Sequence, residues 1–278
     1  MKLKYPLISI IVTTRNEEEV VNKLLSSIKK LRKNNQEIIL VDNFSADNTI
    51  KIARKYEIKI YEYGYERSAQ RNFGAKVAKG EYLLFLDADM ELGEGVIDEC
   101  IKTVKSDKNV GALIIPEESY SHSFWEKVKA FERSYYNLDD SYLTDAARFF
   151  KRSIFLKSGG YDETITGPED WDLTESIKKS GIKVKKINKL IYHYERVSSL
   201  FSLARKKFYY GLKAHRYLKK QRIHLIGPKT IYFLRPVFYK NLDKIISHPI
   251  LSLGLVLMLL IELFGGGLGY LVGRIRKL

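Results

Sequence analysis

Cysteine and proline are both scarce in this sequence. Its 278 residues include one cysteine, Cys100, so an intramolecular disulfide is impossible and a reducing compartment is expected. Six prolines and no low-complexity tract exclude collagen-like, linker-dominated and disulfide-scaffold architectures. Apolar residues make up 45% of the chain and charged residues 29%, a globular composition that rules out wholesale disorder.

Several familiar sequence signals are also missing. There is no repeat of fixed period, no GxGxxG loop and no Walker loop, which weakens dinucleotide-binding and P-loop interpretations. The first mostly apolar run, Leu7–Val12, spans six residues and is soon followed by Arg15 and three glutamates, so it is too short for a signal peptide. We therefore expect the folded domain to stay in the cytosol.

Acidic residues become rare after position 173. Residues 1–173 carry 26 basic and 29 acidic side chains (26 − 29 = −3), residues 174–248 carry 19 and 3 (19 − 3 = +16), and residues 249–278 carry 3 and 1 (3 − 1 = +2). This polarity favours an anionic partner, which could be nucleic acid, anionic lipid head groups or a phosphorylated substrate. A merely solvated basic face is the alternative.

One long apolar run stands near the C-terminus. Residues 249–272, PILSLGLVLMLLIELFGGGLGYLV, contain a single side chain that is charged at neutral pH, Glu262. As a helix the run would be ~36 Å long, enough to cross a bilayer core, with Arg274, Arg276 and Lys277 as an interfacial anchor. The run therefore predicts membrane attachment.

Three features leave the form of that attachment open. Glu262 is costly in lipid, and the glycines at 265–267 could break the run into a re-entrant hairpin. A buried core helix of a soluble protein is the remaining alternative. Gly265, Gly269 and Gly273 share one helical face and could pack against a second helix, including one from another copy of the chain.

The first 116 residues alternate short apolar runs with helical patterns. The expected strands are 7–13, 37–41, 58–63 and 82–86, and the expected helices are 17–33, 48–55 and 68–78. Strands separated by helices predict βαβ units and a mostly parallel sheet, so the fold class is α/β. Such sheets bind ligands at the carboxyl ends of their strands.

An acidic pair follows the most apolar of these strands. Asp87-Ala88-Asp89 comes directly after YLLFL, so both carboxylates can point into one cleft as the strand ends. Carboxylate oxygens suit Mg²⁺ or Mn²⁺, which bind through one or two carboxylates plus substrate phosphates. An isolated DxD is more often a turn, but its place after a buried strand favours a metal site.

Four segments together resemble a known family. In chain order, VTTRNEE, VDNFSADNT, ERSAQRNFGAKVAKGEYLLFLDADM and GPEDWDL are similar to the motif series of the inverting family-2 nucleotide-sugar glycosyltransferases, which have the GT-A fold. The resemblance covers about residues 5–220. It implies one Rossmann-like GT-A domain over residues 1–222. A basic amphipathic juxtamembrane segment over 223–248 and a hydrophobic membrane segment with a basic tail over 249–278 are expected after it.

The resemblance assigns roles on the donor side. It implies a nucleotide-sugar pocket lined by Thr13, Asn16, Glu17, Asp42, Arg71 and Asp87. It also implies that Asp89 binds the divalent cation, with Asp87 and His193 as further ligands. For Arg71 a surface helix position is the alternative, and a lone histidine is often only structural.

On the acceptor side, the resemblance makes Asp170 the general base that deprotonates the acceptor hydroxyl, with Glu169 as the alternate. An already ionised lipid phosphate would need Asp170 only for positioning. Asp172 is expected in the first turn of a helix, where the dipole stabilises a carboxylate. Arg205 and Lys206, on a predicted helix over 200–220, are candidates for the donor diphosphate or a lipid phosphate. Residues 123–136 form an amphipathic pattern that predicts core packing or an acceptor surface.

The leading hypothesis is a membrane-attached, Mg²⁺- or Mn²⁺-dependent hexosyltransferase with a cytosolic catalytic domain. It would move a sugar from a UDP- or GDP-linked donor to a lipid-linked acceptor, such as polyprenyl or dolichyl phosphate or a glycolipid. The alternatives are a tethered transferase with a soluble or protein acceptor, a basic nucleic-acid-binding protein, and a non-catalytic nucleotide-sugar-binding scaffold. No basic-aromatic recognition motif supports nucleic acid as a partner.

Overall fold

The structure is a computed structural model that describes residues 6–31, 35–138 and 146–276. It separates into two compact units. The sheet unit comprises Met1–Pro116, Ala146–Glu163 and Leu173–His193. The helical unit comprises Glu117–Asp145, Thr164–Asp172 and Tyr194–Leu278. Each unit is described by itself below.

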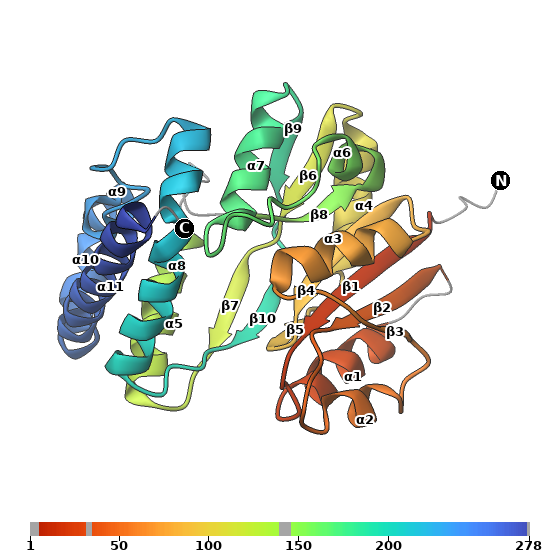
Figure 1. The fold of residues 1–278 in the computed structure, drawn as a ribbon, viewed down its shortest axis with the longest axis horizontal. Coiled ribbons are helices and arrows are strands. Elements are labelled where there is room, and N and C mark those ends of the chain that lie inside the picture. The colour runs from red at the N-terminus through yellow and green to blue at the C-terminus, as the bar shows by residue number, and fades with distance from the viewer. Residues whose placement is uncertain (1–5, 32–34, 139–145, 277–278) are drawn as a thin grey trace. The chain divides into compact units, whose positions relative to one another are not determined.

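The described part of the sheet unit contains a seven-stranded sheet in the order β3-β2-β1-β4-β8-β6-β9 (Figure 1). Its strands are β1 (Ile8–Thr14), β2 (Gln36–Asp42), β3 (Lys59–Glu62), β4 (Tyr82–Asp87), β6 (Val110–Ile114), β8 (Ala147–Lys151) and β9 (Lys183–Lys186). β8 pairs antiparallel with both β4 and β6, and the other pairings are parallel. The predicted α/β class with a mostly parallel central sheet is confirmed.

Helices cover both faces of this sheet, which is why β1 is buried along its whole length. The helices of the sheet unit are α1 (Val21–Leu31), α2 (Thr49–Ala53), α3 (Arg67–Val77), α4 (Val96–Ser106) and α6 (Arg152–Lys157). The side chains of Ile8, Ile10 and Val12 share a core with α1 and α4. Ile11 faces the other way, where a Cβ on Gly74 of α3 would lie 2.6 Å from its Cγ2 atom. Only glycine lets α3 approach β1 this closely.

Two short strands pair beyond the carboxyl end of β4. β5 (Met90–Leu92) pairs antiparallel with β10 (Ile191–Tyr194), and the register sets His193 opposite Met90. Because Asp89 directly precedes Met90, this pairing brings a residue from near position 190 to the end of β4.

The helical unit has a core of its own. Its elements are β7 (Glu117–Tyr120), α5 (Phe124–Tyr136), α8 (Leu200–Gln221), the 3₁₀ helix Tyr232–Leu234, α9 (Pro236–Lys240), α10 (Leu242–Ser247) and α11 (Pro249–Ile275). The first turn of α7 (Glu169–Lys179) also belongs to it. Val128 and Tyr135 of α5 pack with Leu203 of α8 and with Leu255 and Met258 of α11. The core-packing interpretation of residues 123–136 is therefore confirmed.

The helices α8 and α5 each begin directly after a serine that caps the helix. Ser199 caps α8 by accepting a hydrogen bond from the backbone N–H of Ser202, whose side chain in turn accepts from the Ser199 N–H. Ser123 and Glu126 form the same reciprocal arrangement at the start of α5. These caps satisfy backbone donors that no intrahelical carbonyl can reach.

The apolar run near the C-terminus forms one continuous helix, α11, so the re-entrant break at 265–267 is wrong. α11 is long and apolar enough to cross a bilayer, and it is the one such helix in the described residues. One of its faces is nevertheless buried against α5 and α8. Lys277, expected in the basic anchor after it, lies outside the described residues.

Candidate active site

The loops that follow β1 and β2 are hydrogen-bonded into one piece at the carboxyl edge of the sheet. The Asn16 backbone N–H donates to the Ser45 hydroxyl over 2.8 Å, and the Asn16 side-chain oxygen accepts from the Ala46 N–H over 2.9 Å. The Glu17 N–H donates to the Thr49 hydroxyl over 2.7 Å. The predicted nucleotide-binding residues Asn16 and Glu17 therefore belong to a fixed double loop.

Asp42 holds this double loop from inside. Its carboxylate is fully buried and accepts hydrogen bonds from the Thr14 hydroxyl, the Ser45 hydroxyl and the Ser45 backbone N–H, each over 2.6 Å. Thr13 is buried beside it on β1. Asp42 thus fixes the loop conformation, and its direct contact with a nucleotide stays a prediction.

Phe44, which the sequence reasoning passed over, is the exposed side chain of the β2 loop. Its side chain is 66% exposed and its φ angle is +48°, in the left-handed region that a bulky residue rarely occupies. Asn16, across the double loop, has a φ angle of +54°. Such backbone strain clusters at ligand-binding sites. The only available signal was one aromatic residue in a short polar segment.

At the end of β4, Asp87 lies between two arginines. One carboxylate oxygen is 2.6 Å from the Arg71 guanidinium and the other is 3.3 Å from that of Arg148. Burial by itself raises the pKa of Asp87, but the two arginines hold that pKa well below its usual value. Asp87 is therefore an ionised carboxylate whose negative charge is compensated by the two arginines. Its role as a metal ligand stays a prediction.

Arg71 is a buried residue, so the alternative of a surface helix arginine is wrong. Its side chain is 1% exposed, and its guanidinium lies 5.1 Å from the centre of the Tyr161 ring. Arg148 was missed by sequence reasoning, because nothing near it predicts that β8 inserts beside β4. The Leu84–Phe149 register of that pairing carries Arg148 to Asp87.

Asp89 and His193 meet at the same edge. The Asp89 Oδ1 atom is 3.4 Å from the His193 Nε2 atom, as the β5–β10 register requires. One carboxylate and one imidazole fit a partial ligand shell for Mn²⁺ or Mg²⁺, which commonly complete their coordination with water and phosphate oxygens. No group of three His, Cys, Asp or Glu residues is arranged for a metal within the described ranges.

In the helical unit, the GPED segment is pressed against α8. Gly167 has a φ angle of +101°, and a Cβ there would lie 2.8 Å from the Tyr210 Cβ, so only glycine fits. Asp172 is buried and accepts from Lys220 over 2.7 Å and from Gln221 over 2.6 Å, which confirms its place in the first turn of a helix.

The two predicted bases differ in accessibility. Glu169 is fully buried, whereas Asp170 is partly exposed. Of the two carboxylates, Asp170 can therefore be reached by an acceptor with less rearrangement. On α8, Arg205 and Lys206 are exposed to solvent, as a role in binding phosphate requires.

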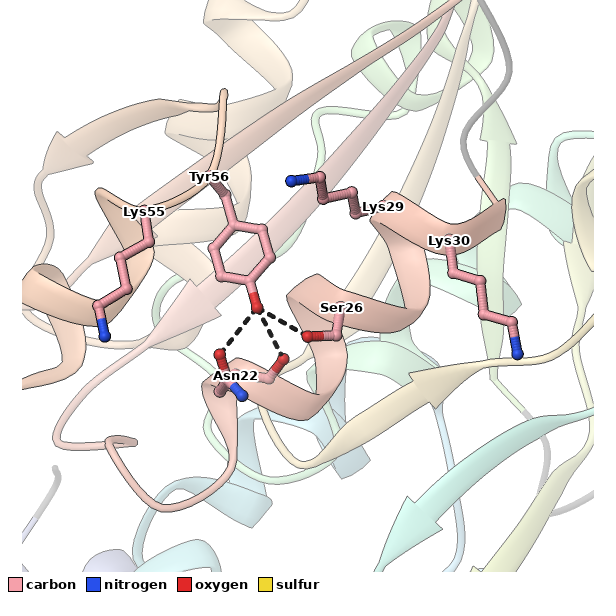
Figure 2. Close-up of a pocket in the computed structure, with 6 residues that line it drawn as sticks. All are labelled: Asn22, Ser26, Lys29, Lys30, Lys55 and Tyr56. Carbon is pink, nitrogen blue, oxygen red and sulfur yellow. Dashed lines mark hydrogen bonds between the residues drawn. The ribbon is translucent and has the colours of Figure 1, made fainter.

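A separate depression of about 440 Å³ lies between α1 and the turn that follows α2 (Figure 2). Its lining residues are Asn22, Ser26, Lys29, Lys30, Lys55 and Tyr56. The Tyr56 hydroxyl is hydrogen-bonded to Asn22 and Ser26 on its floor. It contains none of the predicted donor, metal or base residues.

Comparison with known proteins agrees with this geometry. Residues 9–159, more than half of the chain, match the family model described as glycosyl transferase family 2. The chain is 25% identical over 258 residues to an uncharacterized glycosyltransferase of Methanocaldococcus jannaschii, covering 84% of this chain and 86% of that protein. It is 26% identical over 165 residues to the poly(ribitol-phosphate) beta-N-acetylglucosaminyltransferase TarP of Staphylococcus aureus, covering 54% of this chain and 50% of TarP. The chain thus matches only half the length of TarP.

Solved structures share the fold. S. aureus TarS 1-349 in complex with UDP-GlcNAc has a TM-score of 0.59 at 15% identity, covering 98% of this chain and 91% of that chain. The mannosyltransferase PcManGT from Pyrobaculum calidifontis, in complex with GDP-Man and Mn²⁺, has a TM-score of 0.59 at 16% identity, covering 99% and 87%. The chain belongs to glycosyl transferase family 2 and is a glycosyltransferase with the GT-A fold.

Proposed function

We propose that this glycosyltransferase is membrane-attached, has its catalytic domain in the cytosol and uses Mg²⁺ or Mn²⁺. It moves a sugar from a UDP- or GDP-linked donor to a lipid-linked acceptor, such as polyprenyl or dolichyl phosphate or a glycolipid, with inversion at the anomeric carbon. The observation that carries the proposal is the meeting of Asp89 and His193 at the end of β4.

The donor belongs to the sheet unit in this proposal. The double loop built on Asn16 and Asp42 receives the nucleoside, and Asp87, fixed by Arg71 and Arg148, faces the ribose or the sugar. A divalent cation held by Asp89 and His193 supplies positive charge to the departing diphosphate. The complexes of TarS with UDP-GlcNAc and of PcManGT with GDP-Man and Mn²⁺ support a donor of this class.

The acceptor is activated by Asp170 in this proposal. A base takes the proton from an acceptor hydroxyl as its oxygen attacks the anomeric carbon from the face opposite the diphosphate. The partial exposure of Asp170 favours it for this role over the buried Glu169. With a lipid phosphate the acceptor oxygen is already ionised, and Asp170 then only positions it.

The acceptor class rests on charge and on the apolar helix. Arg205 and Lys206 are exposed on α8, and residues 174–248 carry a net charge of +16 (19 basic, 3 acidic), which complements a phosphorylated acceptor. α11 supplies apolar surface for a lipid environment. The second candidate is a tethered transferase with a polymeric acceptor, because TarP is named for poly(ribitol-phosphate) and basic side chains suit that chemistry equally.

The test uses the purified full chain with Mn²⁺ and a panel of UDP- and GDP-sugars, each offered polyprenyl phosphate, a glycolipid with a free hydroxyl, or a soluble polyol phosphate. Asp170→Asn should bind donor normally but lose about 100-fold or more in transfer to the hydroxyl acceptor. Glu169→Gln, which changes the neighbouring buried carboxylate, is the matched comparison. If Asp170→Asn keeps wild-type transfer to the hydroxyl acceptor while Glu169→Gln loses it, the base assignment is wrong.

A further inference from the structure

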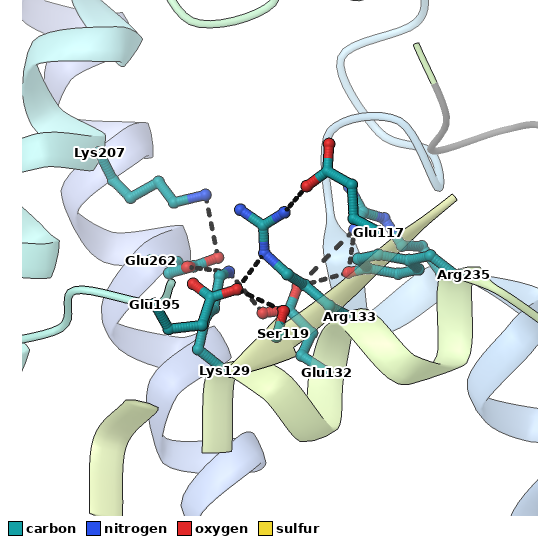
Figure 3. A network of polar contacts seen from close by, with 10 residues as sticks. Glu117, Ser119, Lys129, Glu132, Arg133, Glu195, Lys207, Arg235 and Glu262 are labelled. Carbon is teal, nitrogen blue, oxygen red and sulfur yellow. Dashed lines mark hydrogen bonds and ion pairs between the residues drawn. The ribbon is translucent and has the colours of Figure 1, made fainter. Parts of the chain in front are cut away.

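Within the helical unit, a buried ion-pair network joins α11 to α5 and α8 (Figure 3). The Glu262 side chain is 2% exposed, and its carboxylate lies 2.9 Å from the Lys129 ammonium of α5 and 3.2 Å from the Lys207 ammonium of α8. Lys129 also pairs with Glu132 over 2.5 Å. Glu262 is therefore shared between two lysines on two different helices.

A second observation fixes α11 along its C-terminal half. Added Cβ atoms at Gly265, Gly269 and Gly273 would lie 2.5, 2.1 and 1.8 Å from backbone oxygens of α8. Those oxygens belong to Ala204, Phe208 and Leu212 in the same order. The two helices therefore run parallel and in backbone contact over about two turns, as small-residue stripes permit.

This packing conflicts with a membrane-crossing α11. Glu262 is residue 14 of the 27 in the helix (262 − 249 + 1), so a crossing helix would place it at the bilayer centre. The stretch of α8 that contacts α11 carries Arg205, Lys206 and Lys207. These charged side chains are too costly to bury in the bilayer core, so α8 would not enter the bilayer together with α11. Crossing would require α11 to leave α8 and to expose both lysine partners.

The opposite face of α11 is apolar and exposed. Its exposed large apolar residues are Ile250, Leu253, Val256, Leu257, Leu260, Leu263, Phe264, Leu268, Leu271 and Ile275. They recur every three or four residues, so they form one stripe along a helix ~40 Å long. We call these ten residues the outer stripe. Within the described helix, no charged residue lies in the stripe between Ile250 and Leu271, because the single charge there, Glu262, points inward.

Basic side chains stand at both ends of the outer stripe. Before it, Lys240 and the half-buried Lys244 outnumber the exposed Asp243, and Arg274 and Arg276 are exposed at its end. A crossing helix would place these two groups in opposite head-group layers, whereas a helix lying in the membrane plane keeps both in one layer. An apolar stripe with cationic ends is typical of helices that bind anionic membrane surfaces.

We propose that α11 stays docked on α5 and α8 and binds in plane to one leaflet of an anionic bilayer through its outer stripe, without crossing it. This deepens the membrane attachment of the proposed function, and its test needs neither donor nor acceptor. A failure here would leave the transfer reaction untouched.

The test first measures co-sedimentation of the full chain with vesicles of phosphatidylcholine, with and without phosphatidylglycerol. We expect binding that requires the anionic lipid and weakens about tenfold in high salt. Leu253→Glu and Leu260→Glu in the outer stripe should each reduce binding about tenfold or more without lowering the melting temperature. Leu156→Glu, an exposed leucine on α6, is the matched control and should bind normally.

Variants with one added cysteine then separate a helix that lies in the membrane plane from one that crosses it. Ser247→Cys and Arg274→Cys place thiols at the two ends of α11, while the native Cys100 is buried and serves as the background. In membranes from cells that express the chain, sealed as inside-out vesicles, an impermeant maleimide should label both positions before permeabilisation. Labelling of only one end until the vesicles are permeabilised would show a crossing helix and overturn the proposal. An absence of vesicle binding, or an oligomer that hides the outer stripe, would overturn it as well.

Discussion

At the scale of single residues, the carboxyl edge of the sheet is built largely from buried side chains and strained backbone. Asp42 and Arg71 are both buried: Asp42 accepts a hydrogen bond from the Ser45 hydroxyl, and Arg71 forms an ion pair with Asp87. Phe44 is the exception, since it is exposed and sits at a positive φ angle on the loop after β2. In the proposed function, an exposed aromatic ring held this way is suited to stack on the base of the nucleotide.

Phe44→Ala should therefore weaken binding of the nucleoside diphosphate about tenfold, because stacking of a base on an aromatic ring contributes ~1–3 kcal/mol. Phe44→Tyr keeps the ring and should bind normally. Phe44→Gly should lose the same affinity without lowering the melting temperature, because glycine accepts the left-handed backbone. Calorimetric titration with UDP and GDP measures all three, and equal affinity of Phe44→Ala and wild type would remove the stacking role.

The motif residues could be predicted individually from the sequence, but the side chains that contact them in the fold could not. Asp87, Asp89 and His193 stand at strand ends, where apolar periodicity reveals them. Arg148 and Lys207 acquire their significance only from the strand or helix packed against them. No local pattern encodes that neighbour, because β8 pairs with β4 across more than sixty residues of chain.

At the scale of elements, α11 illustrates how the same residues support opposite interpretations. The sequence of its glycine triplet, 265–267, predicts a break, yet Gly265 and Gly269 are positions where the α8 backbone packs too closely for a Cβ atom. Tertiary contact therefore overrides the weak helix propensity of glycine. Gly267, between them, faces open space, with no atom within 4 Å of the point where a Cβ would stand.

Two substitutions separate these roles. Gly269→Ala should destabilise the chain by about 1–3 kcal/mol, because its new Cβ meets the Phe208 carbonyl oxygen. Gly267→Ala should instead be neutral or stabilise it by up to about 1 kcal/mol through helix propensity. Urea unfolding of both variants provides the measurement. Equal effects of the two substitutions would show that α11 is not docked on α8.

Element positions follow closely from periodicity. The predicted strand 82–86 is observed as Tyr82–Asp87, and the predicted helix 68–78 as Arg67–Val77. The predicted helix 17–33 begins later, at Val21, after a turn in which the backbone N–H groups of Glu17 and Glu18 donate to the side chains of Thr49 and Asp47. Loop contacts of this kind are long-range, so helical spacing alone does not locate them.

At the scale of the whole molecule, the proposed site residues come from both compact units. The residues proposed to bind the nucleotide and the cation lie in the sheet unit, whereas Asp170, Arg205 and Lys206 lie in the helical unit. The family resemblance predicts the order of these segments along the chain and one GT-A domain over 1–222, not their division between two compact units. The donor base, the sugar and the acceptor are set by side-chain shape around the bound molecules, which motifs shared by many family members do not specify.

The central claim is that Asp89 and His193 hold a divalent cation against the donor diphosphate. Calorimetric titration of the full chain with UDP and GDP, in Mn²⁺ or in EDTA, tests it most directly. We predict that Mn²⁺ tightens binding of one nucleotide about tenfold or more, and that Asp89→Asn and His193→Ala abolish this gain. Asp107→Asn is the control, because Asp107 pairs with Lys183 and Lys185 before β6 begins, at the opposite edge of the sheet. Nucleotide affinity that is the same in EDTA and in Mn²⁺, for wild type and Asp89→Asn alike, would contradict the account.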